Sequence, residues 1–425
     1  MKERLEVIII GAGIGGLAAA VGLSTKGHKV IIYERDPEVS EIGAGIQITP
    51  NFTRILRRWG LGKRLHERGV NTLSSRHRRW EDGKILSEYA LNANDQMEKK
   101  YGDPYYHIHR ADLQAILLEK ANELGVTCRT SAHVVDYVHQ GGKERVVFTD
   151  GTSSTADLIV AADGNRSILA KHVLGHDVPS SSVGDSAYRG LIPREQMQDP
   201  LLKDLDLEYN QDVWLGPHSH TVTYYVRGGE MFNFIVALPD EPGEESWKAP
   251  GDINKLRKHF ENWDPRIRAI ASKIDQSYIW KLRDRPALER WVHPHGSLVL
   301  LGDAAHPMLP YVAQGASSAV EDAAVLAECL DYAKAGTRDV QSVLQAYEKI
   351  RKPRALHMKN AARSNRAQFH MPDGPDQQAR DKTMKDESIS DRSINMFKDK
   401  ERAQFLYGHD VVNEVHEYFQ ATAKL

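Results

Sequence analysis

The chain has 425 residues, 41% of them hydrophobic and 27% charged, which is an ordinary balance for a globular protein with a sizeable core. Its formal net charge of −2 excludes a global attraction to nucleic acid or anionic lipid, and with only Cys128 and Cys329 we expect neither a disulfide framework nor a metal site. No apolar run comes near the roughly 18 residues of a membrane span, so no integral membrane segment is expected.

The first elements along the chain form a predicted βαβ unit. Val7–Ile10 is expected as a buried strand, Gly15–Thr25 as a helix and Lys29–Tyr33 as a second strand. Two strands joined by a helix in this way imply a parallel sheet.

Three glycines and one acid give this unit its chemistry. Gly11 allows the tight turn after the first strand, Gly13 lets the backbone approach a pyrophosphate, and Gly16 lets the helix pack on the strand. Glu34 follows the second strand, where its carboxylate would accept hydrogen bonds from ribose hydroxyls and would repel a 2′-phosphate. The pattern therefore predicts bound FAD or NAD rather than NADP.

Periodicity and turn residues predict the next elements. Helices are expected over Phe52–Glu67 and His109–Gly125. Hairpins are expected to turn at Asp82-Gly83 and at Asp150-Gly151, and a buried strand follows at Leu158–Ala161. The nucleotide domain is thus resumed after an excursion.

The character of the sequence changes between residues 180 and 280. Alternation in "HTVTYYVRGGEMFNFIVAL" predicts an antiparallel sheet with a face for a substrate, and "SLVLLGDAAHPMLPYVAQGASSAVEDAAVLAECL" then returns to a strand, a loop and a long helix. Residues 372–393 are polar and charge-dense, so a long surface loop or partial disorder is expected there. The cluster Arg76, Arg78 and Arg79 is expected on a solvated strand face.

Two later motifs decide between the nucleotides. The stretches "DLIVAADGNRS" at 157–167 and "GDAAHPMLP" at 302–310 resemble the DG and GD fingerprints of the class A flavoprotein aromatic hydroxylases, the para-hydroxybenzoate hydroxylase superfamily. The stretches "EIGAGIQITPN", "HRADL", "AYRG", "HTVTYYVRGG" and "PYVAQGASSAVEDA" look most like salicylate hydroxylase and its fungal relatives. Tyr225 departs from that branch, which has proline there, so the identity of the substrate is open. The resemblance covers most of residues 5–360 and implies tightly bound FAD.

The resemblance also implies the fold and its division into domains. We expect an α/β protein with a doubly wound FAD-binding domain, Rossmann-like and of the glutathione reductase type, an inserted antiparallel-sheet substrate domain, and C-terminal helices. The expected bounds are 1–75, 106–178 and 285–360 for the FAD-binding domain, 76–105 for a hairpin excursion toward the substrate side, 179–284 for the substrate domain, and 361–425 for a C-terminal loop and helices.

Further FAD contacts follow from the same resemblance. They are expected from Arg35, Ala44, Gly45, Gln47, Arg110, Val134, Asp163, Asp303, Gly315 and Ala316. Asp303 would accept a ribityl hydroxyl, and Arg110 would reach the pyrophosphate and ribityl region. A helix that begins near Gly315 would direct backbone N–H groups at the flavin N1/O2 edge. The structural alternatives are an exposed loop acid for Asp303, a surface arginine at the start of a helix for Arg110, and a simple turn for Ala44, Gly45 and Gln47.

Three residues of the predicted substrate sheet are candidates for catalysis. Arg189 and Tyr224 would hold a phenolate or carboxylate, and His220 could take the phenolic proton near neutral pH. Each has a structural alternative, namely an ion-paired strand arginine, a core tyrosine and a packed histidine. His306, in the GD motif, is expected to have a positional role.

The predicted activity is that of an FAD-dependent monooxygenase. NADH or NADPH, bound transiently, would reduce the flavin, O₂ would add at C4a, and the resulting hydroperoxyflavin would hydroxylate an activated, salicylate-like phenol. Three flavoprotein alternatives stay open: a fungal-type monooxygenase that acts on a larger polyketide or indole substrate, a non-hydroxylating flavin oxidase or dehydrogenase, and a non-catalytic flavoprotein. A nicotinamide dehydrogenase is the fourth alternative, and the DG and GD motifs argue against it.

The expected partner is a small aromatic substrate, and the protein is expected to be a monomer or homodimer in the cytoplasm. The ending Ala423-Lys424-Leu425 differs by one residue from the S-K-L peroxisome signal, so import into peroxisomes is the alternative location.

Overall fold

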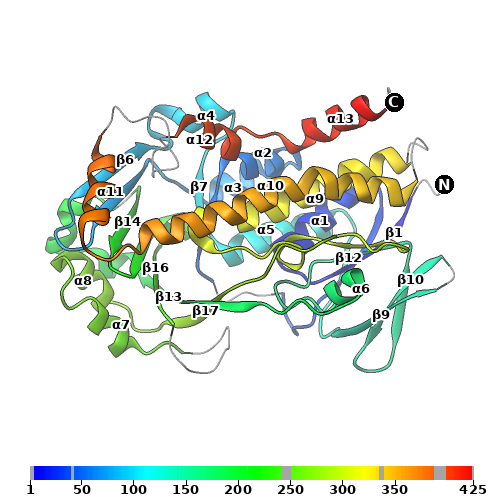
Figure 1. Cartoon of the computed structure of the whole chain (residues 1–425), viewed down its shortest axis with the longest axis horizontal. Coiled ribbons are helices and arrows are strands. Elements are labelled where there is room, and N and C mark those ends of the chain that lie inside the picture. Colours follow the sequence, from blue (N-terminus) through cyan, green and yellow to red (C-terminus); the bar gives the residue numbers. More distant parts are fainter. Residues whose placement is uncertain are drawn as a thin grey trace.

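A computed structural model describes residues 4–39, 43–140, 142–207, 209–240, 250–334, 339–386 and 399–423. Figure 1 shows a parallel sheet with long helices at one end of the molecule and a region dominated by a second, larger sheet at the other. This arrangement confirms the predicted α/β class, with a Rossmann-like region and a separate antiparallel region.

Five parallel strands form the first sheet, in the order β18-β12-β1-β2-β8. Their bounds are Glu6–Ile10 (β1), Lys29–Tyr33 (β2), Thr127–Arg129 (β8), Leu158–Ala161 (β12) and Leu298–Leu300 (β18). Strands β1, β12 and β18 are almost entirely buried, which explains why each is a continuous apolar run. Helix α1, Ile14–Thr25, follows β1, so its N-terminus lies at the carboxyl edge of the sheet.

Helices cover one face of this sheet and a small antiparallel sheet covers the other (Figure 1). Helix α1 packs between α5, Arg110–Glu123, and α9, Gly315–Lys334. The small sheet contains β9, Val134–Gln140, β10, Lys143–Phe148, and β11, Ser153–Ala156. The β10–β11 hairpin turns at the predicted Asp150-Gly151, and the short helix α6, Ala170–Leu174, packs near β18.

The larger sheet has seven strands in the order β17-β13-β16-β15-β14-β5-β6. Their bounds are Ser74–Arg79 (β5), Ile85–Ala90 (β6), Ser181–Pro193 (β13), Asn210–Gly216 (β14), Ser219–Val226 (β15), Met231–Pro239 (β16) and Tyr278–Asp284 (β17). Every neighbouring pair is antiparallel except β14 and β5, which are parallel. The predicted hairpin around Asp82-Gly83 joins β5 to β6 and thus extends this sheet.

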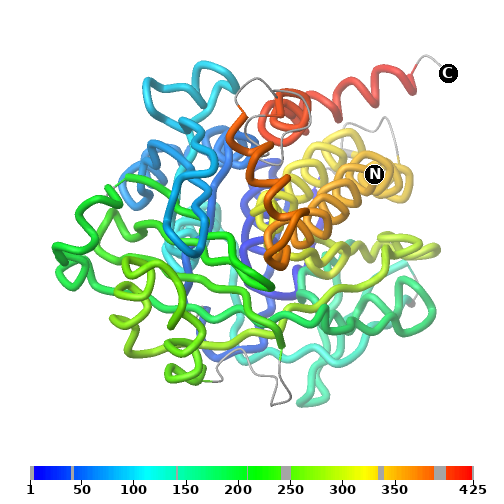
Figure 2. Tube along the Cα trace, turned by 60° about the vertical axis from the view of Figure 1, so that its left-hand side comes forward, coloured from blue at the N-terminus to red at the C-terminus, as the bar shows by residue number. Residues whose placement is uncertain are grey.

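The two faces of the seven-stranded sheet have different neighbours. Helices α7, Ile253–His259, and α8, Pro265–Ser272, supply buried side chains that pack on one face. The other face packs against the loop that follows the GD motif, including Leu309 and Tyr311. In Figure 2 most of this sheet, in green, lies opposite the yellow and orange helices α9 and α10, Val340–Phe369. The second face is therefore the one turned toward the nucleotide-binding region.

A third, small sheet connects the two regions. It has the order β3-β7-β4, with bounds Gly45–Ile48 (β3), Val70–Asn71 (β4) and Tyr106–His109 (β7). The single helix predicted over Phe52–Glu67 is wrong: α2, Pro50–Arg58, and α3, Gly62–Arg68, are separate. Gly60 lies between them with a φ of 77°, a left-handed conformation that ends the first helix. Helix α4 follows at Gln96–Tyr101.

The C-terminal part is more helical than predicted. Within 372–393, α11, Pro375–Lys385, is an ordered helix, whereas residues 387–398 lie outside the described residues. Its residues Arg380 and Met384 are buried, so packing rather than composition decides its structure. Helices α12, Lys400–Tyr407, and α13, Val411–Thr422, follow, and the last two residues of the proposed peroxisome signal are outside the described range.

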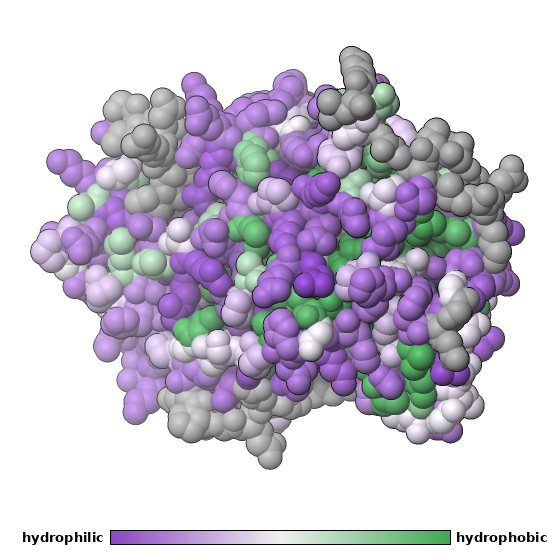
Figure 3. All heavy atoms as spheres, turned by 45° about the vertical axis from the view of Figure 1, so that its right-hand side comes forward, coloured by the Kyte–Doolittle hydropathy of each residue, from purple (hydrophilic) through white to green (hydrophobic). Residues whose placement is uncertain are grey.

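The surface corrects one further expectation. Figure 3 shows hydrophilic side chains over most of the face drawn, with apolar residues dispersed among them. Arg76 and Arg78 do not belong to such a surface, because they are 5% and 4% exposed and both bind Asp212 on the neighbouring strand β14. Only Arg79 of that cluster is partly exposed. No helix in the described part of the chain combines the length and the apolar character that a membrane span requires.

Candidate flavin and substrate site

The glycine turn after β1 is shaped by close backbone approach. Gly11 has a φ of 100°, and a Cβ there would lie 2.5 Å from the carbonyl oxygen of Ala162, at the end of β12. A Cβ at Gly16 would lie 2.0 Å from the carbonyl oxygen of Gly11, whereas one at Gly13 would meet no atom within 4 Å. The turn is therefore closed toward the sheet and open at Gly13, beside the N-terminus of α1, where a pyrophosphate would fit.

Glu34 lies next to this turn. Its carboxylate accepts a hydrogen bond from the Ala12 N–H at 2.7 Å and one from the Asp36 N–H at 2.9 Å. Arg35 points to solvent, with a side chain that is 67% exposed and paired with Asp36. Val134 is buried at the start of β9. Glu34 is thus held against the glycine turn, and its bond to a ribose hydroxyl stays a prediction.

The DG and GD motifs meet on the same side of the sheet. Burial raises the pKa of Asp163, whose Oδ2 accepts the Ile168 N–H at 3.0 Å, while its buried Oδ1 has no hydrogen-bond partner among the described residues. Arg285, which is 4% exposed, donates to the carbonyl oxygens of Asn165 and Ala304 and so links the two motifs. The sequence pattern had not indicated Arg285.

Asp303 and Arg110 influence each other. Burial raises the pKa of Asp303, and electrostatic interactions with the nearby His306 and Arg110 act against this rise. Burial lowers the pKa of Arg110, and Asp303 acts against that fall. The side chain of Asp303 is nevertheless accessible to solvent. A carboxylate that is accessible yet surrounded by protein is the environment expected beside a bound polar cofactor.

Strand β3 joins the cofactor side to the substrate sheet. The Gly45 N–H donates to Oδ1 of Asn233 on β16 at 2.7 Å, and a Cβ at Gly45 would lie 2.4 Å from the Tyr224 ring. Buried Ala44 accepts the backbone N–H of Arg110 at 3.0 Å, and Gln47 accepts the hydroxyl of Tyr105. Only glycine at position 45 lets the two elements approach this closely.

Helix α9 begins at Gly315 and presents its first turn on this side. Gly315 and Ala316 are both partly accessible, and the side chain of Met308 would lie 3.7 Å from a Cβ at Gly315. Accessible N–H groups at the N-terminus of a 20-residue helix provide a site for negative charge. This agrees with the predicted role toward the reduced flavin, which stays a prediction.

Arg189 is a cation without an acidic partner among the described residues. Its guanidinium lies 4.2 Å from the centre of the Trp280 ring, and its buried Nε has no hydrogen-bond partner there either. No carboxylate pairs with it anywhere in the described ranges, in contrast to the buried Arg76 and Arg78. Burial, reinforced by Arg110, lowers its pKa to about 9. The predicted alternative of an ion-paired strand arginine is therefore wrong for the described part of the chain.

Tyr224 lies between Gly45 and a neutral histidine. Its ring stacks on His107 at a centroid distance of 3.8 Å, and burial raises its pKa while Arg189 acts in the opposite direction. Burial lowers the pKa of His107 to about 3, and its two ring nitrogens bind Thr72 at 2.6 Å and Gln211 at 2.8 Å. His107 thus fixes the plane of the tyrosine ring.

His220 has different neighbours from Arg189 and Tyr224. Its Nδ1 lies 2.8 Å from Nε2 of His370, and its ring packs on Phe369 and Tyr311. Burial lowers its pKa well below 6.5, and His370 adds to this effect, so the imidazole is neutral. The contacts bring Gly45, Arg110, Arg189, Tyr224 and Asp303 together but leave His220 in a separate histidine pair. Its role as a base stays a prediction.

Sequence reasoning missed several members of this site. They are Tyr105, His107, Asn233, Trp280 and Arg285. Asn233 had a usable signal, because it is a lone amide in the apolar strand "MFNFIVAL", where a polar side chain needs a partner. The others are recognisable only by what they contact.

Comparison with known proteins agrees with this geometry. Residues 4–362 match the family described as "FAD binding domain". The chain belongs to the FAD-dependent aromatic hydroxylases. It is 37% identical to FAD-dependent monooxygenase OpS4 of Beauveria bassiana, over 90% of each chain, and 36% identical to 3-amino-4-hydroxybenzoate 2-monooxygenase of Streptomyces cremeus, over 91% of this chain and 93% of that protein.

A solved relative carries the cofactor. The structure of Klebsiella pneumoniae HpxO complexed with FAD and uric acid has a TM-score of 0.79 and 27% identity, and the match covers 93% of this chain and 96% of that one. The residues of this hydroxylase fit FAD on their own evidence: an open glycine turn at Gly13, the unpartnered Oδ1 of Asp163, and the accessible Asp303.

Proposed function

We propose that this hydroxylase uses NADH or NADPH and O₂ to hydroxylate a phenolic aromatic acid of the salicylate type. The observation that carries the proposal is Arg189, a partly accessible guanidinium whose Nε is buried and which has no acidic partner in the described ranges, beside the hydroxyl-bearing Tyr224. Burying a cation without a counter-ion is costly, so a site that keeps one is suited to an anionic ligand. The name of the Streptomyces cremeus relative, a hydroxybenzoate monooxygenase, supports the same substrate class.

The register of the sheet defines the surface on which the ring would lie. Val222 on β15 pairs with Ile235 on β16, which pairs with Arg189 on β13, and all three are partly accessible. Adjacent residues in a sheet share a face, so two apolar side chains lie next to the guanidinium. An aromatic acid would rest its ring on the apolar pair and direct its carboxylate to Arg189.

The chain's own residues would bind, orient and exclude water. Arg189 would bind the carboxylate or phenolate, and Tyr224, held by His107, would direct the ring by one hydrogen bond. Asp303, Arg110 and Glu34 would hold the polar parts of FAD. Bound FAD, once reduced by the nicotinamide nucleotide, supplies the activation of O₂ and the transfer of one oxygen atom to the ring.

The test is a substrate screen with the FAD-loaded protein. Oxidation of NADH and of NADPH is followed against salicylates, resorcylates and larger phenols, each beside its methyl ester, and product masses are measured. We expect the free acids to stimulate oxidation and to gain one oxygen atom. Equal turnover of acids and esters would overturn the role of Arg189.

Three other outcomes would replace the proposal. Turnover restricted to larger polyketide or indole phenols would favour the secondary-metabolite alternative. Reduction of the flavin by substrate without a nicotinamide nucleotide would identify an oxidase or dehydrogenase. Bound FAD without any substrate-stimulated oxidation of NADH or NADPH would indicate a non-catalytic flavoprotein.

A further inference from the structure

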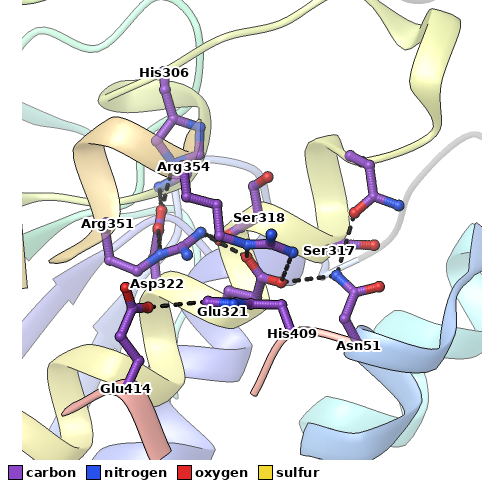
Figure 4. A network of polar contacts seen from close by, with 12 residues as sticks. Asn51, His306, Ser317, Ser318, Glu321, Asp322, Arg351, Arg354, His409 and Glu414 are labelled. Atoms are coloured by element: carbon purple, nitrogen blue, oxygen red, sulfur yellow. Dashed lines mark hydrogen bonds and ion pairs between the residues drawn. The ribbon is translucent and has the colours of Figure 1, made fainter. Parts of the chain in front are cut away.

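Two adjacent acids of helix α9, Glu321 and Asp322, belong to a network of polar contacts (Figure 4). The side chains of Glu321 and Asp322 are 1% and 0% exposed. Each binds an arginine of α10: Glu321 contacts Arg354 at 2.8 Å and Asp322 contacts Arg351 at 2.8 Å. The two acids are alike in burial and in charge, but their remaining contacts differ.

The second oxygen of Asp322 binds the turn of the GD motif. Its Oδ2 accepts the Gly302 N–H at 3.0 Å and lies 2.5 Å from Nε2 of His306. Gly302 has a φ of 62°, so this backbone donor belongs to a left-handed turn immediately before Asp303. One carboxylate therefore holds both ends of the segment Gly302–His306.

Glu321 makes no contact with this turn in the described part of the chain. Its oxygens bind Arg354 and the Asn51 side chain at 2.8 Å and Arg351 at 2.9 Å, so it joins α9 to α10 and α2 and shares Arg351 with Asp322. Figure 4 shows the two acids directed to different partners, with His306 on the side of Asp322 and Asn51 on the side of Glu321. The chain thus offers a matched control for the loss of a buried, arginine-paired charge.

Asp322 connects two cofactor elements that are distant in the sequence. It lies two turns into α9, whose first residue is Gly315, and it binds the turn that carries Asp303. Burial would raise the pKa of Asp322, but His306 and Arg351 outweigh it and lower the pKa, so the carboxylate is charged at neutral pH. A charged acceptor binds an N–H more strongly than a neutral one.

We propose that Asp322 is a positioning residue for FAD, which acts through Gly302 and His306 to hold Asp303 in place relative to the N-terminus of α9. A turn already held in its binding conformation costs less to order when the cofactor binds. The inference rests on the binding of FAD and is independent of the proposed substrate. Its failure would therefore leave the substrate proposal untouched.

The first experiment compares Asp322→Asn with Glu321→Gln in the full chain. Apoprotein is prepared, its unfolding temperature is measured, and FAD is titrated by quenching of flavin fluorescence. We expect both variants to lose thermal stability, because each leaves a buried arginine with one fewer charge partner. Only Asp322→Asn is expected to raise the Kd for FAD, by about tenfold, as the loss of a charge-assisted hydrogen bond predicts.

The second experiment tests the route through His306. His306→Leu alone is expected to raise the Kd for FAD. In the double variant with Asp322→Asn, the Kd is expected to rise by a smaller factor than the product of the factors for the two single variants. The pair His306→Leu and Glu321→Gln should come closer to independent changes, because Glu321 is linked to His306 only through Arg351 and Asp322. If Asp322→Asn does not fold, His306→Leu and Glu321→Gln test the proposal: the Kd for FAD should rise more in His306→Leu than in Glu321→Gln.

Two results would overturn the proposal. One is an equal rise in the Kd for FAD in Asp322→Asn and Glu321→Gln, which would mean that both acids act only on general packing. The other is a Kd within about twofold of the wild type in Asp322→Asn or His306→Leu, because a lost hydrogen bond to a charged group should exceed that change.

Discussion

Replacement of Arg189 by methionine is expected to weaken the binding of an anionic aromatic ligand without lowering the stability of the protein. The guanidinium lies on Trp280 at 4.2 Å and has no acidic partner in the described structure, so its burial costs free energy that no ion pair offsets. Methionine keeps an apolar contact with the ring and removes that cost. Stability and affinity should therefore change in different directions.

The size of the effect follows from the bonds that would be lost. A hydrogen bond to a charged group contributes about 1.5–3 kcal/mol, which corresponds to about a ten- to a hundredfold rise in the Kd for a carboxylate ligand. A neutral analogue such as the methyl ester makes no such bond and should bind both proteins alike. The contrast between acid and ester isolates the contribution of the charge.

The dependence on pH gives a second, independent readout. Burial and the nearby Arg110 lower the pKa of Arg189 to about 9, so the ligand-free guanidinium loses its proton as the pH rises through that value. Because only the protonated form attracts an anion, wild-type affinity for a benzoate without a phenol group should fall above about pH 9. The affinity of Arg189→Met should stay level over the same range.

The assay is calorimetric titration of the FAD-loaded protein with matched acids and esters, together with thermal unfolding. The control is Arg194→Met. The Arg194 guanidinium lies 5.2 Å from the centre of the Tyr225 ring, and Tyr225 packs in the hydrophobic cluster on the opposite face of the sheet, so this arginine is also on an aromatic ring but away from the substrate face. The reasoning is refuted if Arg189→Met binds the acid as the wild type does, or if Arg194→Met loses as much affinity.

Three further sets of variants test the site and the fold. Tyr224→Phe should keep FAD but release more H₂O₂ and less product per nicotinamide nucleotide oxidised, and unchanged coupling would make the tyrosine a purely structural residue. Glu34→Ala and Asp303→Ala should each weaken FAD binding by about 1–3 kcal/mol, measured as flavin content after dialysis. Asp212→Asn should lower the free energy of unfolding in urea by about 3–5 kcal/mol, because two buried arginines lose their shared carboxylate.

Local chemistry was readable from the sequence. Gly11 and Gly16 are needed in the turn because a Cβ at either position would clash with the backbone. The order of strand, turn and helix around them follows from the short-range periodicity of apolar residues. The hairpins at Asp82-Gly83 and Asp150-Gly151 were predicted for the same reason, since two residues at a turn decide its geometry.

Expectations that depended on distant partners failed more often. Arg76 and Arg78 are spaced like residues of a solvated strand, but Asp212 lies more than a hundred positions away and enters between them only when β14 pairs with β5. Helix α11 has a polar composition, yet packing of Met384 against the rest of the molecule gives it a buried side. Neither Asp212 nor the residues that pack on Met384 could be identified from the sequence around the affected segment alone.

The sequence by itself determined that the bound nucleotide is a flavin, and it predicted Gly13 as the place of the pyrophosphate and the side chains that would carry the chemistry. Only the tertiary structure decided which neighbours those side chains have. It placed Tyr224 against Gly45 and Arg189 on Trp280 with no carboxylate partner among the described residues, and it paired His220 with His370. The physical reason is that strand order and register determine which residues meet, and they are settled by the packing of the whole core rather than by any one segment.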